Sequence, residues 1–183
     1  MSTTFDVVAV VGSLRRDSHT RRLVRALAKL APSSLRIEIV EIGALQAYTE
    51  DLDTAPTAEW TTFRERVARA DAVLFATPEY NRSVPGVLKN AIDVGSRPYG
   101  KSVWAGKPAA IISVSPGALG AFGANHHLRQ SLMFLDMPTL QQPEAYIGGI
   151  ATLLDEEGRI TDEGREKFFV SFLEAFESLI RER

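Results

Sequence analysis

Residues 7–21 are Val7-Val8-Ala9-Val10-Val11-Gly12-Ser13-Leu14-Arg15-Arg16-Asp17-Ser18-His19-Thr20-Arg21, an apolar run followed by a loop of hydroxyl and guanidinium side chains. A buried strand that ends in such a loop and continues into a helix is how α/β proteins often build a phosphate site. The helix N-terminus supplies unpaired backbone N–H groups and the positive end of the helix dipole. Hydroxyl donors come from Ser13, Ser18 and Thr20, and positive charge comes from Arg15, Arg16 and Arg21.

The loop favours a terminal monophosphate over a nucleotide pyrophosphate. It lacks the Lys-Ser/Thr ending of a P-loop and the Gly-x-Gly-x-x-Gly pattern that brings a pyrophosphate against backbone. Clustered donors of this kind can surround the three free oxygens of a terminal phosphate. The alternative is a simple helix N-cap with solvated basic residues beside it.

Apolar runs of strand length alternate with helix-patterned segments along the chain. This alternation is typical of a parallel sheet between helices, and the continuous apolar character of the runs predicts burial on both faces. We expect an α/β fold, a flavodoxin-like doubly wound five-stranded parallel sheet of order 2-1-3-4-5 with helices on both faces and ligand at the carboxyl ends of strands 1 and 3. The expected strands cover 5–11, 35–40, 72–76, 108–114 and 145–149, and the expected helices cover 20–30, 57–70, 84–94, 121–134 and 161–181.

The composition limits the class of protein. The 183 residues, 45% of them hydrophobic, suffice for one domain with a substantial core, so a single domain over 1–183 is expected. With 21 basic and 23 acidic side chains, the net charge is −2, without the basic excess of a nucleic-acid binder or the acidity of many small electron carriers. No cysteine is present, which excludes disulfides, thiolate nucleophiles and iron–sulfur clusters. The ligand is therefore expected to be a small molecule.

The sequence carries no pattern for a membrane, an export signal or a metal. Its first residues have no basic region with an apolar core, and no run approaches the ~20 apolar residues that span a bilayer. A cytoplasmic protein that binds neither membrane nor nucleic acid is expected. His19 is far along the chain from His126 and His127, and adjacent helical residues point about 100° apart, so no metal site is expected.

Two further loops follow strands that end at the same sheet edge. The first is Thr77-Pro78-Glu79-Tyr80-Asn81-Arg82-Ser83-Val84-Pro85-Gly86, in which two prolines restrict the backbone, Tyr80 can stack on a ring and Asn81 can pair with its polar edge. The alternative is a proline-bounded loop with a buried tyrosine. The second is Ser113-Val114-Ser115-Pro116-Gly117-Ala118-Leu119-Gly120-Ala121, whose small residues let backbone approach a ligand. Three such loops at one crevice predict a site for a planar heterocycle that carries a phosphate.

The chain resembles the NADPH-dependent FMN reductases of flavodoxin-like fold, a family that includes bacterial quinone, chromate and azo-dye reductases. Its most specific segment is Pro-Glu-Tyr-Asn-x-Ser-x-Pro-Gly at 78–86, and the resemblance covers nearly the whole chain. The matching motifs are Gly12-Ser13-Leu14-Arg15 with Ser18, then 78–86 continuing to Leu88-Lys89-Asn90-Ala91-Ile92-Asp93, then Gly106-Lys107-Pro108 leading to Ser115-Pro116-Gly117, and His127-Leu128-Arg129-Gln130.

The resemblance implies FMN as cofactor and NADPH or NADH as reductant. It implies that the FMN phosphate is held by Ser13, Arg15, Ser18, Thr20 and Arg21, although Thr20 stands where many relatives carry asparagine. The isoalloxazine would be flanked by Pro78, Glu79, Tyr80 and Asn81, and the third side would be closed by Ser115, Gly117 and Gly120.

The resemblance also implies a homodimer. A homotetramer is the alternative, which the sequence disfavours because Gly123 and His126 stand where some tetrameric relatives use larger residues to join dimers. In the loop before the fourth strand, Arg97-Pro98-Tyr99 and Trp104 are candidates for covering the flavin from either subunit.

The activity implied is that of an NAD(P)H-dependent flavoprotein oxidoreductase. Hydride would pass from the nicotinamide to bound FMN, and the electrons would then leave to a second small acceptor: a quinone, free flavin, chromate, an azo compound or a nitro compound. Because this chemistry belongs to the cofactor, no side chain is expected to be catalytic in proton transfer. One alternative is an FMN-binding electron carrier that serves a protein partner without NAD(P)H activity of its own, which the near-neutral charge disfavours. The other is a phosphate-binding regulatory module without flavin.

Overall fold

The apolar runs form the strands of a parallel sheet. The computed structural model describes residues 4–183, and within them the strands are β1 (Phe5–Val11), β2 (Leu35–Val40), β3 (Ala72–Thr77), β4 (Ala109–Val114) and β5 (Ala145–Ile147). The sheet order is β2-β1-β3-β4-β5, and each neighbouring pair is parallel. The predicted flavodoxin-like topology is confirmed.

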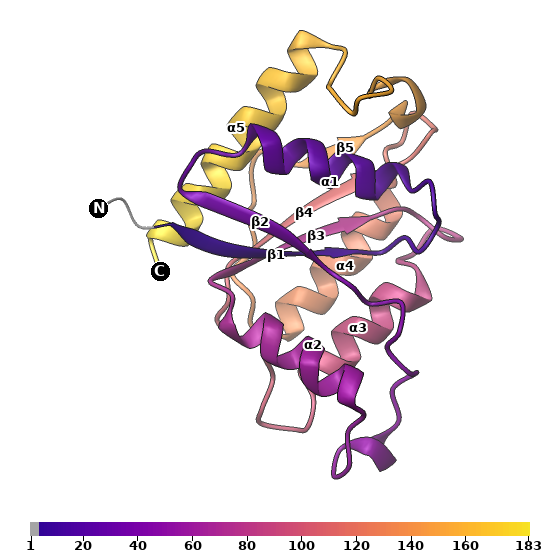
Figure 1. Ribbon diagram of the computed structural model, residues 1–183, viewed down its shortest axis with the longest axis vertical. Helices are drawn as coiled ribbons and strands as arrows, with labels where there is room; N and C mark the ends of the chain where they lie inside the picture. The colour runs from indigo at the N-terminus through magenta and orange to yellow at the C-terminus, as the bar shows by residue number, and fades with distance from the viewer. Residues whose placement is uncertain (1–3) are drawn as a thin grey trace.

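Helices cover both faces of this sheet. Two of them, α1 and α5, pack on one face, and α2, α3 and α4 pack on the other (Figure 1). Every predicted helix is present in residues 4–183, with ends that differ from the prediction by at most two residues, and two short 3-10 helices were not predicted. Their bounds are α1 (His19–Leu30), η1 (Glu50–Leu52), α2 (Ala58–Arg69), α3 (Gly86–Ser96), α4 (Phe122–Phe134), η2 (Ile150–Thr152) and α5 (Glu163–Arg181).

The central strands contribute side chains to two cores in alternation. In β1, Val7, Ala9 and Val11 pack on the side of α1 and α5, whereas Val8 and Val10 pack on the side of α2, α3 and α4. All residues of β3 and β4 are buried. A strand that is covered on both faces needs an apolar residue at every position, because each face removes its side chains from water.

The edge strand β2 differs from the prediction. Burial on both faces was expected for 35–40, but only Leu35 is buried, and Arg36 and Glu38 are exposed. The expectation is wrong because β2 is an edge strand with one covered face: Leu35, Ile37 and Ile39 pack on the core shared by α1 and α5, whereas Arg36 and Glu38 lie on the other face. Charged side chains on an edge strand also disfavour pairing with a further strand.

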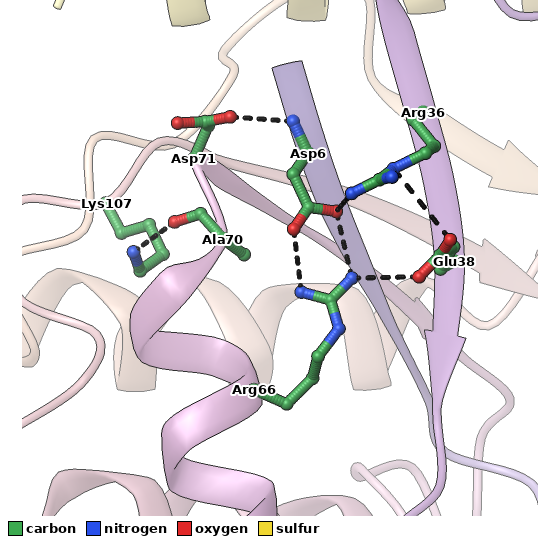
Figure 2. A network of polar contacts seen from close by, with 7 residues as sticks. All are labelled: Asp6, Arg36, Glu38, Arg66, Ala70, Asp71 and Lys107. Carbon is green, nitrogen blue, oxygen red and sulfur yellow. Dashed lines mark hydrogen bonds and ion pairs between the residues drawn. The ribbon is translucent and has the colours of Figure 1, made fainter. Parts of the chain in front are cut away.

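A network of charged side chains joins α2 to this edge of the sheet (Figure 2). Arg66 in the last turn of α2 donates two hydrogen bonds to the carboxylate of Asp6 on β1, at 3.0 and 2.9 Å, and a third to Glu38 at 3.2 Å. Arg36 lies 3.4 Å from the same Asp6 carboxylate. The network lies at the amino end of β1, away from the edge at which the predicted ligand loops leave the sheet.

Lys107 fixes the end of α2 next to this network. Its ammonium donates to the carbonyl oxygen of Ala70, the C-cap residue of α2. The Asp71 carboxylate accepts a hydrogen bond of 2.7 Å from the backbone N–H of Asp6. Burial lowers the pKa of Lys107. The Gly-Lys-Pro motif before β4 therefore has a structural role at the helix terminus.

Candidate functional site

The three predicted loops meet in one open cleft at the carboxyl ends of β1, β3 and β4. The cleft has a volume of about 220 Å³ and is open to solvent on one side. The cleft is lined by Ser13, Arg15, Ser18, His19 and Thr20 after β1, by Pro78, Glu79 and Tyr80 after β3, by Val114, Ser115 and Pro116 at the end of β4, and by Ile150. His19, Val114, Pro116 and Ile150 were not predicted. Ile150 begins η2 after β5, and no local pattern places it beside the first loop.

The loop between β1 and α1 carries buried hydroxyl groups at the N-terminus of a helix. Ser13, Ser18 and Thr20 are all buried, although they are polar. Ser18 is the N-cap of α1, and its Oγ accepts a hydrogen bond of 3.1 Å from the backbone N–H of Arg21. The first turn of α1 contains no acidic residue, so its dipole remains free to attract an anion. Arg15 is exposed and takes no part in the ion pairs found among residues 4–183.

The Arg21 guanidinium points away from these donors. Both of its terminal nitrogens donate to the carboxylate of Glu41, at 2.5 and 2.8 Å. This pairing lowers the pKa of Glu41 and raises that of Arg21. Arg21 does not line the cleft, so its predicted contact with a phosphate would require the guanidinium to leave Glu41.

The loop after β3 forms a tight hairpin at 79–83. The backbone of Tyr80 and Ser83 is joined by two hydrogen bonds of 2.9 and 3.0 Å. Asn81 and Arg82 between them have φ values of 50° and 65°, the left-handed backbone of a type I′ turn. Tyr80 is 54% exposed, so the alternative of a buried tyrosine is wrong. Asparagine often occupies the first central position of a type I′ turn, but the arginine at the second central position does not indicate such a turn.

The Glu79 carboxylate is directed at α4. Its Oε2 accepts a hydrogen bond of 3.2 Å from the backbone N–H of Ala124 in the first turn of α4, and its Oε1 lies 3.0 Å from the Arg82 guanidinium. Glu79 therefore lines the cleft while both carboxylate oxygens are occupied elsewhere. Asn81 is not among the residues that line the cleft.

The loop after β4 is held by a buried polar pair that the sequence analysis missed. Ser113 Oγ donates to the carbonyl oxygen of Gly120 at 2.7 Å and accepts from Asn125 Nδ2 at 3.2 Å. The available signal was a serine within an otherwise apolar strand and an asparagine inside a helix. Gly120 has φ +57°, and a Cβ there would lie 2.5 Å from the backbone carbon of Tyr146. Gly117 donates its N–H to Ser115 Oγ at 3.0 Å, and neither glycine lines the cleft directly.

Trp104 does not cover the cleft. Its side chain is 0% exposed, packs against Phe63 and Phe75, and donates its indole N–H to the carbonyl oxygen of Ile92. The prediction that Trp104 covers the flavin is therefore wrong. Burial of the Trp104 indole also requires a glycine at position 95, since a Cβ at that position would lie 2.4 Å from the indole ring.

The Arg97-Pro98-Tyr99 segment does not line the cleft of its own subunit either. Arg97 donates a hydrogen bond of 2.8 Å to the Tyr48 hydroxyl. Tyr99 is 91% exposed. A role for this segment toward a second subunit stays a prediction.

The described part of the chain contains neither a metal-binding cluster nor a helix that could span a membrane. Residues 4–183 contain no group of three or more His, Asp or Glu side chains placed to hold a metal ion. No helix in the same range is both long and apolar enough to cross a bilayer.

The topology and the cleft together define a class of protein. A parallel sheet of order 2-1-3-4-5 with an anion-binding loop after β1, and with further loops at the same edge, is the architecture of flavodoxin-like FMN-binding proteins. The donors in the cleft suit FMN, because buried hydroxyls at a helix N-terminus fit a terminal phosphate and an exposed tyrosine beside the same cleft fits a planar ring.

Comparison with known proteins identifies the family. The model of the NADPH-dependent FMN reductase family matches residues 5–152, and the chain belongs to this family. A quinone reductase of Pseudomonas putida is 59% identical over 182 residues, which cover 99% of this chain and 97% of that protein. A 2-hydroxy-1,4-benzoquinone reductase of a Burkholderia species is 45% identical, with 97% of each chain covered. The solved structure of a flavoenzyme NAD(P)H:(acceptor) oxidoreductase from Paracoccus denitrificans superposes with a TM-score of 0.93, at 41% identity and 98% coverage of each chain.

The chain is accordingly an NAD(P)H-dependent flavoprotein oxidoreductase with FMN as its cofactor. The expectation of this activity and cofactor pair, which followed from the motifs at 12–18 and 78–86, is confirmed.

Proposed function

We propose that the protein reduces quinones to hydroquinones at a single FMN site in the cleft between the loops after β1, β3 and β4. The observation that carries the proposal is the convergence of these loops on one open cleft, which leaves one side accessible to solvent and to small substrates. The name of the 59% identical relative, a quinone reductase, supports the acceptor class. Overall, NAD(P)H, a proton and a quinone would yield NAD(P)⁺ and a hydroquinone.

Bound FMN supplies the redox chemistry, since it accepts a hydride from the nicotinamide and returns two electrons to the acceptor. The protein binds and orients the reactants in turn. We assign the phosphate to Ser13, Arg15, Ser18 and Thr20, supported by their common position on the cleft and by the free N-terminus of α1. No residue is assigned proton transfer.

Arg21 is assigned a conditional role. Its bidentate pair with Glu41 occupies the guanidinium, so it would meet a phosphate only after that pair opens. The substitution Glu41→Gln removes the negative partner and tests this point. Tighter FMN binding by the variant would support Arg21 as a phosphate ligand, whereas unchanged affinity would leave Arg21 outside the site.

We assign the isoalloxazine to the loops after β3 and β4. Pro78, Glu79 and Tyr80 line one side of the cleft and Ser115 lines another. Asn81, Gly117 and Gly120 belong to the same loops without lining the cleft, so they would act through backbone shape or after a small shift on binding.

The experiment that tests the proposed function begins with FMN-loaded, desalted protein under anaerobic conditions. One equivalent of NADPH should bleach the flavin absorbance, and one equivalent of 1,4-benzoquinone should restore it with formation of hydroquinone. Retained flavin that NADPH does not reduce would favour an electron carrier. Reduced flavin that benzoquinone does not reoxidise would reject the acceptor class, and absence of retained flavin would reject the site.

The proposal also covers the domain, the oligomeric state and the cellular location of the protein. We propose one FMN-binding domain over 1–183, a homodimer and a cytoplasmic location. Exposed apolar side chains at Leu119, Phe122, Met133 and Phe134, on or next to α4, support association of subunits. The lack of cysteine is compatible with a reducing compartment. Light scattering during size-exclusion chromatography tests the dimer, and fractionation of the source cells tests the location.

A further inference from the structure

We infer that His127 on α4 is a positioning residue that holds the 79–83 hairpin in the conformation that binds FMN. The inference rests on the proposed FMN site, because Tyr80 of this hairpin lines the cleft. His127 acts through Ser83 and does not itself line the cleft.

The connection from His127 to Tyr80 is short. Nδ1 of His127 lies 2.9 Å from Ser83 Oγ. Ser83 is in turn joined to Tyr80 by two backbone hydrogen bonds, at 2.9 and 3.0 Å. A displacement of Ser83 therefore moves the backbone of Tyr80 as well.

The hairpin needs contacts from outside to keep its shape. Asn81 and Arg82 both adopt left-handed backbone, which arginine adopts only at a cost in conformational energy and asparagine at a smaller cost. Both residues are exposed, so their own side chains add little packing. Such strained turns persist where the surrounding structure holds them.

The first two turns of α4 provide these contacts at three positions. Ala124 donates its backbone N–H to Glu79 at 3.2 Å. Gly123 lies directly against the hairpin, since a Cβ there would be 2.8 Å from the carbonyl oxygen of Arg82. His127, one turn further along, reaches Ser83. Residues three and four apart share one helix face, so the hairpin packs along a single face of α4.

The helix is a firm support for the hairpin. Asn125, Leu128 and Leu132 are buried away from the hairpin, and Asn125 takes part in the hydrogen bonds that hold the loop after β4. Of the contacts that α4 makes to the hairpin, the one from His127 is made by a side chain of α4. It can therefore be removed by substitution without changing the hairpin sequence.

The neighbouring histidine provides a matched control. His126 is also exposed and on α4, but its imidazole lies 3.1 Å from the Tyr146 hydroxyl and packs on Phe122, away from Ser83. Replacement of His126 by leucine should therefore leave the hairpin unchanged.

The test uses His127→Leu, His127→Asn, Ser83→Ala, the double variant with His127→Leu and Ser83→Ala, and His126→Leu. Loss of one exposed hydrogen bond should weaken FMN binding by about two- to tenfold in both His127→Leu and Ser83→Ala. The double variant should be no weaker than either single variant, because both remove the same contact. His127→Asn should recover most of the affinity, since its amide occupies the position of imidazole Nδ1. Hydrogen exchange of the Tyr80 and Ser83 amides, measured without FMN, should accelerate in His127→Leu and not in His126→Leu.

Additive effects in the double variant, or equal losses in His126→Leu, would overturn the assignment to the Ser83 contact. Unchanged FMN affinity in His127→Leu would overturn the positioning role, whatever the exchange rates. If the wild-type protein failed to bind FMN, the proposed function would fall with the role in binding. Exchange in the FMN-free protein would then still show whether α4 holds the hairpin.

Discussion

Replacement of Gly120 by alanine should destabilise the protein by about 2–5 kcal/mol, and the structure divides this cost into two parts. The backbone at Gly120 has φ +57°, and left-handed backbone costs a residue with a Cβ about 1–2 kcal/mol. The new Cβ would also lie 2.5 Å from the carbon and 2.8 Å from the oxygen of the Tyr146 carbonyl, and 2.7 Å from the nitrogen of Ile147. These are backbone atoms of β5 and cannot rotate away, so overpacking should add about 1–3 kcal/mol.

Replacement of Gly149 by alanine measures the cost of the left-handed backbone alone. Gly149 has a similar φ of +65°, but no atom lies within 4 Å of a Cβ at that position. Urea unfolding followed by circular dichroism should show a loss of about 1–2 kcal/mol for Gly149→Ala and a larger loss for Gly120→Ala. Because Ser113 holds the Gly120 carbonyl, Gly120→Ala should also shift the loop after β4 and weaken FMN binding. Equal free energies of unfolding for the two variants would refute the steric argument.

Three further substitutions, the first paired with a control variant, test other parts of the molecule. Arg15→Ala should weaken FMN binding by about tenfold or more, because a charged donor to a phosphate is lost. Arg16 does not line the cleft, so the control Arg16→Ala should bind FMN as the wild type does. Fluorescence titration with FMN compares the affinities of the two variants. Arg66→Leu should lower the free energy of unfolding by about 1–3 kcal/mol in urea, since it leaves the partly buried Asp6 carboxylate without its bidentate partner. Hydrogen bonds from Ser34 and Arg181 lower the pKa of Glu177 below its ordinary value of 4.5. The ionised Glu177 carboxylate therefore stabilises the folded state at pH values above 4.5, and this contribution is lost as the pH falls through the lowered pKa. Glu177→Gln should therefore be less stable than wild type at neutral pH, and the difference in unfolding free energy should close in acid; a constant difference would contradict the assignment.

The parts of the fold that could be predicted are those fixed by local pattern. β1, β3 and β4 are buried on both faces, and their sequences are apolar at nearly every position, so their existence and order followed from the alternation with helices. The failure at β2 has the same origin. Its exposed Arg36 and Glu38 alternate with apolar residues, which is the pattern of a strand covered on one face and not of the strand buried on both faces that was predicted.

The meeting of the three loops could be predicted because parallel strands end at a common edge. The direction of individual side chains could not, since it depends on partners far along the chain. Arg21 is turned aside by Glu41 on the segment after β2, and Glu79 is turned toward α4 by a backbone N–H 45 residues later. Trp104 packs in the core against Phe63 and Phe75, which lie 41 and 29 residues earlier in the chain. None of these partners lies within the local sequence window from which the roles were inferred.

The two ends of the proposed FMN site depend on opposite faces of the sheet. The hydroxyl groups at the phosphate end are fixed by α1, which packs in the core shared with α5, whereas the hairpin at the ring end is held by α4, which packs in the other core. Between β1 and β3 the successive connections leave the sheet toward opposite faces, so one small ligand can reach both supports there. Positive charge at the phosphate end comes from Arg15, because Arg21 is already matched by Glu41 and the other donors that line the cleft there are neutral. Recognition of the phosphate would therefore depend on Arg15 together with directed hydrogen bonds and the dipole of α1. Orientation of the ring would depend on the contacts that α4 makes with the left-handed turn.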